Sequence, residues 1–76
     1  MQLKITIINP TQVVFKGEAS RVILPGEFGV FEVLPFHKNM MTRLLKGSVD
    51  VDGRLFDIMR GAVKVDQNEV TVVLEC

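Results

Sequence analysis

Apolar and polar side chains alternate along most of the chain with a period of two. In the segment "QLKITII", Leu3, Ile5 and Ile7 face one way, while the polar residues between them face the other. This alternation is typical of a β-strand that packs one face on a core and leaves the other in water. Asn9 and Pro10 favour turns, so we expect the first strand to end there.

Two glycines predict reversals in the next part of the chain. The runs "VVF" and "EASRVIL" lie on either side of Gly17, which predicts two strands joined by a tight reversal at residues 16–18. In Leu24-Pro25-Gly26-Glu27, proline presets the first central residue of a type II turn, and glycine accepts the positive φ needed at the second. The run "FGVFEVL" is expected to form the next strand and to end at Pro35.

The clearest local pattern is "SVDVDGRLFDIM", in which Asp52-Gly53 predicts a two-residue type I′ turn. This turn places Val51 opposite Arg54 and Val49 opposite Phe56. Val49, Val51, Phe56 and Ile58 then share a face, with Leu55 and Met59 as exceptions, and this agreement fixes the register of the hairpin.

A second hairpin is predicted in "AVKVDQNEVTVVL", with Val65 opposite Val70 and Val63 opposite Val72. The two hairpins and the earlier strands together define an expected core. Its predicted members are Ile5, Ile7, Phe15, Val22, Leu24, Val49, Val51, Phe56, Ile58, Val63, Val65, Val70 and Val72.

The segment "NMMTRLLKG" fits two structures. Asn39 would cap a short helix that ends at Gly47, whereas Met40, Thr42 and Leu44 also alternate as in a strand. With either outcome, about 8–10 short strands separated by closely spaced turn residues predict an all-β fold. We expect a small antiparallel β-sandwich.

The composition favours a subunit over a free module. The 76 residues suffice for a single domain, residues 1–76, which buries only about 60% of the surface of its unfolded chain. The chain is 47% hydrophobic and carries no formal net charge. Many apolar side chains must therefore reach the surface, and exposed apolar surface marks partner sites.

Several classes of partner and chemistry are excluded. The chain has no basic run for nucleic acid and no apolar run of the ~20 residues needed for direct membrane insertion. His37 would have to act as every base of a catalytic site, and one histidine with one cysteine, Cys76, cannot hold zinc. Asp50, Asp52 and Asp57 flank a hairpin turn, where we expect solvated carboxylates rather than a catalytic pair. We expect no enzyme, no cofactor and no metal site.

Three segments carry a resemblance to a known family. The segment "VVFKGEASRVILPG" is followed by Gly29 and Phe31, then by "LPFHKNMMT", and later by "MRGAVKVDQNEVTVVL". In this order and spacing, from Ile8 to Leu74, the chain resembles the amino-terminal β-sandwich of the epsilon subunit of F-type ATP synthase, called delta in mitochondria.

The chain departs from that family at several positions. Phe36 stands where the family has the glycine before histidine, and Lys38-Asn39 replaces Ala-Pro. Glu32 and Arg60 also replace glycines. The family commonly continues into a helical hairpin, whereas this chain stops at Cys76, so the expected fold has no C-terminal helical hairpin.

The resemblance implies a non-catalytic rotor subunit of the central stalk. Such a subunit links gamma to the membrane ring and couples proton translocation to ATP synthesis. It is peripheral on the cytoplasmic face of a bacterial inner membrane, or on the equivalent face of an organelle. The family's ring-facing loop maps onto Glu27, Phe28, Gly29 and Val30, and its gamma-facing surface includes His37 and Thr42.

The resemblance also indicates that "NMMTRLL" is extended, and we expect Phe28 and Val30 to be exposed. For Phe31, a core position and a contact position both stay open. A second function is also open: a stand-alone β-sandwich or OB-like module that binds a peptide at an exposed strand edge.

Overall fold

The computed structural model describes residues 2–75. Within this range every element of regular secondary structure is a β-strand. This confirms the all-β prediction, and "MMTRL" is a strand rather than a helix. The nine strands are β1 (Leu3–Ile8), β2 (Val13–Ala19), β3 (Val22–Gly26), β4 (Gly29–Val33), β5 (Met40–Leu44), β6 (Gly47–Val51), β7 (Arg54–Ile58), β8 (Gly61–Asp66) and β9 (Glu69–Leu74).

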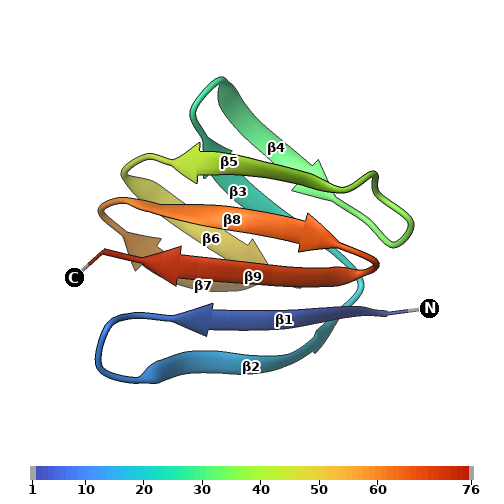
Figure 1. Ribbon diagram of the computed structural model, residues 1–76, viewed down its shortest axis with the longest axis horizontal. Helices are drawn as coiled ribbons and strands as arrows, with labels where there is room; N and C mark the ends of the chain where they lie inside the picture. The colour runs from blue at the N-terminus through green and yellow to red at the C-terminus, as the bar shows by residue number, and fades with distance from the viewer. Residues whose placement is uncertain (1, 76) are drawn as a thin grey trace.

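The strands form one curled sheet that folds over itself. Eight of them follow the hydrogen-bonded order β2-β1-β9-β8-β5-β3-β6-β7, and β4 pairs with β3 beside this path. Between β5 and β3 the register joins one described pair, Gly26 with Leu44, so the sheet turns a corner there. In Figure 1, β1, β9, β8 and β5 lie in front of β3, β6 and β7, which gives the two layers of a sandwich.

One pairing differs from the expected antiparallel sheet. Strands β1 and β9 run parallel, from Lys4 opposite Glu69 to Ile8 opposite Val73. The direction of β9 is set by its hairpin with β8, and β1 inserts between β9 and β2, so both edges of β1 are paired. The alternation of side chains along a strand does not indicate which distant strand it pairs with, so the sequence pattern could not predict this partner.

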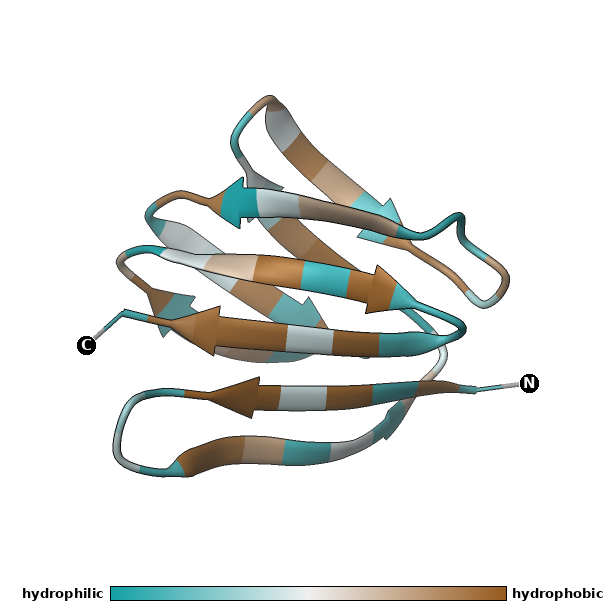
Figure 2. Ribbon diagram, in the orientation of Figure 1, coloured by the Kyte–Doolittle hydropathy of each residue, from teal (hydrophilic) through white to brown (hydrophobic). Residues whose placement is uncertain are grey.

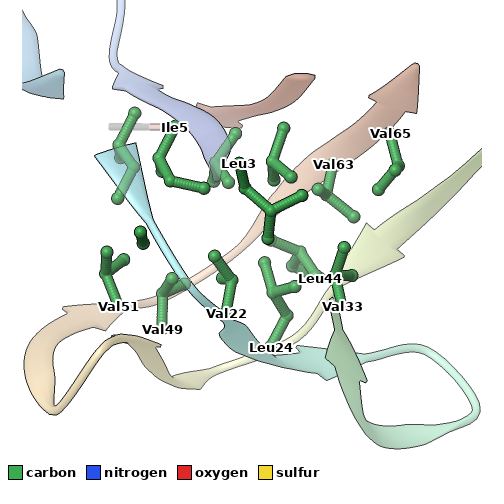
Figure 3. Packing of buried hydrophobic residues seen from close by; sticks show 14 of the residues in the cluster. Leu3, Ile5, Val22, Leu24, Val33, Leu44, Val49, Val51, Val63 and Val65 are labelled. Carbon is green, nitrogen blue, oxygen red and sulfur yellow. The ribbon is translucent and has the colours of Figure 1, made fainter. Parts of the chain in front are cut away.

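The apolar faces of the two layers meet in one core. Figure 2 shows apolar and polar residues alternating along β1, β8 and β9, and Figure 3 shows side chains from both layers converging. The predicted core is confirmed except that Phe15 and Phe56 are half-buried and pack on its edge. The buried apolar residues are Leu3, Ile5, Ile7, Ala19, Val22, Leu24, Val33, Leu44, Val49, Val51, Ile58, Val63, Val65, Val70 and Val72.

Both predicted hairpins are present in the predicted register. Val49 lies opposite Phe56 and Val51 opposite Arg54. The turn residues Asp52 and Gly53 have φ values of 49° and 91°, as a type I′ turn requires. In the second hairpin, Val63 pairs with Val72 and Val65 pairs with Val70.

The predicted reversal at Gly17 is wrong. Strand β2 continues through Gly17 and pairs with β1 from Ala19 opposite Leu3 to Val13 opposite Ile8. Gly17 allows the ring of Phe15 to pack closely on the strand and does not form a turn, because a Cβ at this position would lie 3.1 Å from that ring. A glycine inside a strand is often explained by such a close approach.

The chain reverses after β2 at residues 20–21, where a distant carboxylate holds the corner. The N–H groups of Ser20 and Arg21 donate to Asp52, at N···O distances of 2.9 and 3.1 Å. Asp50 accepts from the N–H of Gly53 at 2.7 Å, and Asp57 accepts from the Ser48 hydroxyl. Asp52 and Asp57 are thus exposed, as expected, whereas Asp50 is half-buried, and each of the three accepts a hydrogen bond from a main-chain N–H or a hydroxyl group.

Within residues 2–75, no helix is long and apolar enough to cross a membrane. The same residues contain no group of three His, Cys, Asp or Glu side chains placed to hold a metal ion. Cys76 lies outside the described residues.

Candidate functional site

The first candidate surface is the turn between β3 and β4. The predicted type II turn is wrong: the tip consists of Glu27 and Phe28, flanked by the pair Gly26 and Gly29. Pro25 instead continues β3 opposite Val30. This pair falls at a non-hydrogen-bonded position of the ladder, so β4 needs no N–H from the proline.

Two glycines shape this turn for different reasons. Gly29 has a φ of 125°, a backbone conformation that side chains with a Cβ rarely adopt. At Gly26, a Cβ would lie 2.6 Å from the ring of Phe31. Phe31 therefore covers Gly26 and packs, half-buried, against the core. The structure assigns this aromatic ring to the domain's own packing.

Backbone hydrogen bonds tie the turn to β5. The N–H of Glu27 donates to the carbonyl oxygen of Arg43 at 3.0 Å, and the N–H of Leu45 donates to that of Pro25 at 2.9 Å. These two bonds tie the β3 side of the turn to β5, while the side chains of the turn are exposed to solvent. Phe28 is 95% exposed and Val30 is 74% exposed, which confirms the expected exposure of both.

The second candidate surface is the loop between β4 and β5, which carries His37. The N–H of His37 donates to the carbonyl oxygen of Leu34 at 3.1 Å. Its ring Nδ1 lies 2.7 Å from the carbonyl oxygen of Lys38, and because a carbonyl oxygen only accepts, Nδ1 donates to it. The side chain is half-buried.

Thr42 lies on β5, opposite the buried Val63 of β8. It is half-buried and shares its face of β5 with Met40 and the buried Leu44. The two predicted surfaces lie at opposite ends of β4: the turn precedes the strand and the loop follows it (Figure 1).

Sequence reasoning missed a third feature, an open groove of about 910 Å³ between the end of β5, the β7–β8 turn and the end of β9. Its apolar lining includes Leu45 and Met59, which are 51% and 66% exposed. A signal for it existed, because Met59 breaks the apolar-in and polar-out rule of its hairpin.

The chain is similar to known proteins along nearly its whole length. Residues 2–75 match the family described as "ATP synthase, Delta/Epsilon chain, beta-sandwich domain". The ATP synthase epsilon chain of Sulfurimonas denitrificans is 37% identical over 79 residues, which cover 97% of this chain and 61% of that protein. The epsilon chain of Campylobacter fetus is 37% identical over 78 residues, covering 96% and 60%. The chain thus spans about three fifths of the length of these curated relatives.

Two solved structures share the fold. One is a mitochondrial ATP synthase of Euglena gracilis with a TM-score of 0.87, 18% identity, and coverage of 96% of this chain and 50% of that one. The other is the central stalk and c-ring of the Tetrahymena thermophila mitochondrial ATP synthase, with a TM-score of 0.82, 14% identity, and coverage of 100% and 65%. The nine-stranded curled sheet and the match over residues 2–75 agree. The chain therefore belongs to the family of ATP synthase delta and epsilon chains, and its residues 2–75 correspond to the β-sandwich domain of that family.

Proposed function

We propose that this chain is a non-catalytic central-stalk subunit of an F-type ATP synthase. It links the gamma subunit to the membrane ring and so couples proton translocation to ATP synthesis. The family match supports this role, and the relatives are epsilon chains. Residues 1–76 then form a single epsilon-type domain, peripheral on the cytoplasmic face of a bacterial inner membrane or the equivalent organelle face.

The ring contact in this proposal is the turn of Glu27, Phe28, Gly29 and Val30. The observation that supports it most is a large apolar side chain, Phe28, at 95% exposure on a turn that main-chain hydrogen bonds at Pro25 and Glu27 tie to β5. A rigid exposed aromatic loses little entropy on binding, which makes it a good interface anchor. The gamma contact in this proposal includes His37 and Thr42.

The substitution Val30→Asp tests the ring contact. Val30 is 74% exposed, so the variant should fold with an unchanged unfolding midpoint. A carboxylate in the interface would be desolvated, so we expect binding to the detergent-solubilised ring to weaken at least tenfold, about 1.4 kcal/mol. Binding is measured by surface plasmon resonance on the immobilised ring, with gamma present.

Val13→Asp is the matched control. Val13 is also exposed, at 58%, but it lies on β2, at the far end of the hydrogen-bonded order from the turn. Ring affinity should be retained in this variant. Equal affinity of the wild type and Val30→Asp would remove the turn from the ring contact, and loss of folding would move Val30 into the core.

One observation favours the alternative function, a module that binds a peptide at a strand edge. Among the described strands, β4 pairs with β3 alone, so the main-chain groups of Val30 and Glu32 on its other edge face outward. Copurification separates the two functions. A stalk subunit comes away with gamma and the catalytic head, whereas an edge-binding module does not.

A further inference from the structure

Phe36 occupies a backbone conformation that an aromatic residue rarely adopts. Its φ is 69°, in the left-handed region, where the Cβ of an L-residue crowds its own main chain. Glycine avoids this crowding, and asparagine and aspartate tolerate it better than other residues do. A phenylalanine here is therefore a strained choice.

Burial inside the domain does not compensate for this strain. The side chain of Phe36 is 76% exposed, and it is not among the residues packed on the core. Leu34, two residues earlier in the same loop, is 47% exposed. The loop thus presents two apolar side chains to solvent beside His37, at the surface proposed above to face gamma.

The strained conformation is fixed by the turn between β8 and β9. The N–H of Phe36 donates to Oδ1 of Asn68 at 2.7 Å. In return, Oδ1 of Asn39 accepts from the N–H of Gln67 at 3.0 Å. The carbonyl oxygen of Asn68 also accepts from the N–H of Lys4, at 2.9 Å, so this turn is joined to the sheet. The loop is held on both sides of Phe36.

We propose that Phe36 is an anchor residue for the gamma subunit, inserted into an apolar pocket of gamma, and that Asn68 positions it. This inference rests on the proposed function and adds to it a contact residue and the device that orients it. Strained residues persist where the surrounding structure holds them and cluster at binding sites. An aromatic ring that is oriented before binding loses little freedom in the complex.

The test separates the ring of Phe36 from its backbone strain. Phe36→Ala removes the ring but keeps a Cβ, and therefore the strain, in the left-handed conformation. Phe36→Gly removes both the ring and the Cβ, and so also the strain. We expect both variants to bind purified gamma at least about tenfold more weakly, measured by calorimetric titration. Phe36→Gly should also unfold at a higher temperature than the wild type, because the strain is relieved.

Leu55→Ala is the matched control, since it truncates a large apolar side chain that is 63% exposed on β7, outside both proposed contacts, and it should leave gamma affinity unchanged. Unchanged affinity of Phe36→Ala and Phe36→Gly, beside wild-type chain that binds gamma, would overturn this inference and leave the proposed function standing. Failure of the wild-type chain to bind gamma would overturn both.

Asn68 provides a second, independent measurement. Asn68→Ala frees the N–H of Phe36 and should weaken gamma binding, while Asn68→Asp keeps an acceptor oxygen and should restore it. If Asn68 acts through Phe36, the double variant Phe36→Ala with Asn68→Ala binds no more weakly than Phe36→Ala alone. Additive losses in this cycle would show that Asn68 does not act by positioning the ring.

Discussion

Asp52 shows how one side chain serves two parts of the chain. It forms the type I′ turn of the β6–β7 hairpin, and its carboxylate accepts the N–H groups of Ser20 and Arg21 at the β2–β3 corner. We predict that Asp52→Ala lowers the free energy of unfolding by about 1–2 kcal/mol. Two N–H groups lose their partner, and alanine tolerates the φ of 49° poorly. Urea denaturation followed by circular dichroism measures the change.

The control for this residue is Asp57→Ala. The Asp57 carboxylate accepts from the Ser48 hydroxyl across the same hairpin, but it bonds no distant corner of the chain. Its removal should change stability by about 0.5 kcal/mol or less. Equal losses for both variants would mean that the β2–β3 corner does not depend on Asp52.

Among the elements, strands β2 and β7 lie at the two ends of the hydrogen-bonded order and approach each other through side chains. The rings of Phe15 and Phe56 have centroids 5.3 Å apart, and the guanidinium carbon of Arg54 lies 5.5 Å from the centroid of Phe15. We predict that Phe56→Ala costs about 2 kcal/mol. This is less than for a fully buried ring because Phe56 is half-buried.

Thermal and urea unfolding of Phe56→Ala measure this cost, with Leu55→Ala as control. Leu55 precedes Phe56 on β7 but is 63% exposed, so its truncation should cost about 0.5 kcal/mol or less. A cost for Phe56→Ala as small as that of the control would show that the two strands are not joined by this aromatic contact.

For the whole molecule, the parallel pairing of β1 with β9 joins the two ends of the chain. Terminal strands usually fray, but here Ile5 and Ile7 are fully buried between β2 and β9. We predict that their amides exchange with solvent only by global unfolding, with the same free energy as those of Val22 in β3. Native-state hydrogen exchange followed by NMR measures this.

The amide of Gln12, in the exposed connection between β1 and β2, should exchange far faster and serves as the internal reference. Exchange of the β1 amides at a free energy clearly below that of β3 would mean that the ends of the chain open independently. The sandwich would then not behave as one cooperative unit.

The sequence by itself determined the strand faces and the register of both hairpins. Alternation assigns each side chain to a face, and a two-residue turn such as Asp52-Gly53 fixes which residues lie opposite each other. Both signals act between neighbours in the chain. The exposure of Phe28 and Val30 was also predictable, because the resemblance marked that turn as a contact surface.

Only the tertiary structure decided the roles of two glycines and of the residues that make long-range contacts. Gly17 and Gly26 suggested reversals, but they are glycines because the rings of Phe15 and Phe31 pack over them. The parallel partner of β1 and the bond from Asn68 to Phe36 join residues far apart in sequence. A local pattern predicts which face of the sheet a side chain occupies. It does not predict which residue, distant in sequence, will contact that side chain in the folded protein.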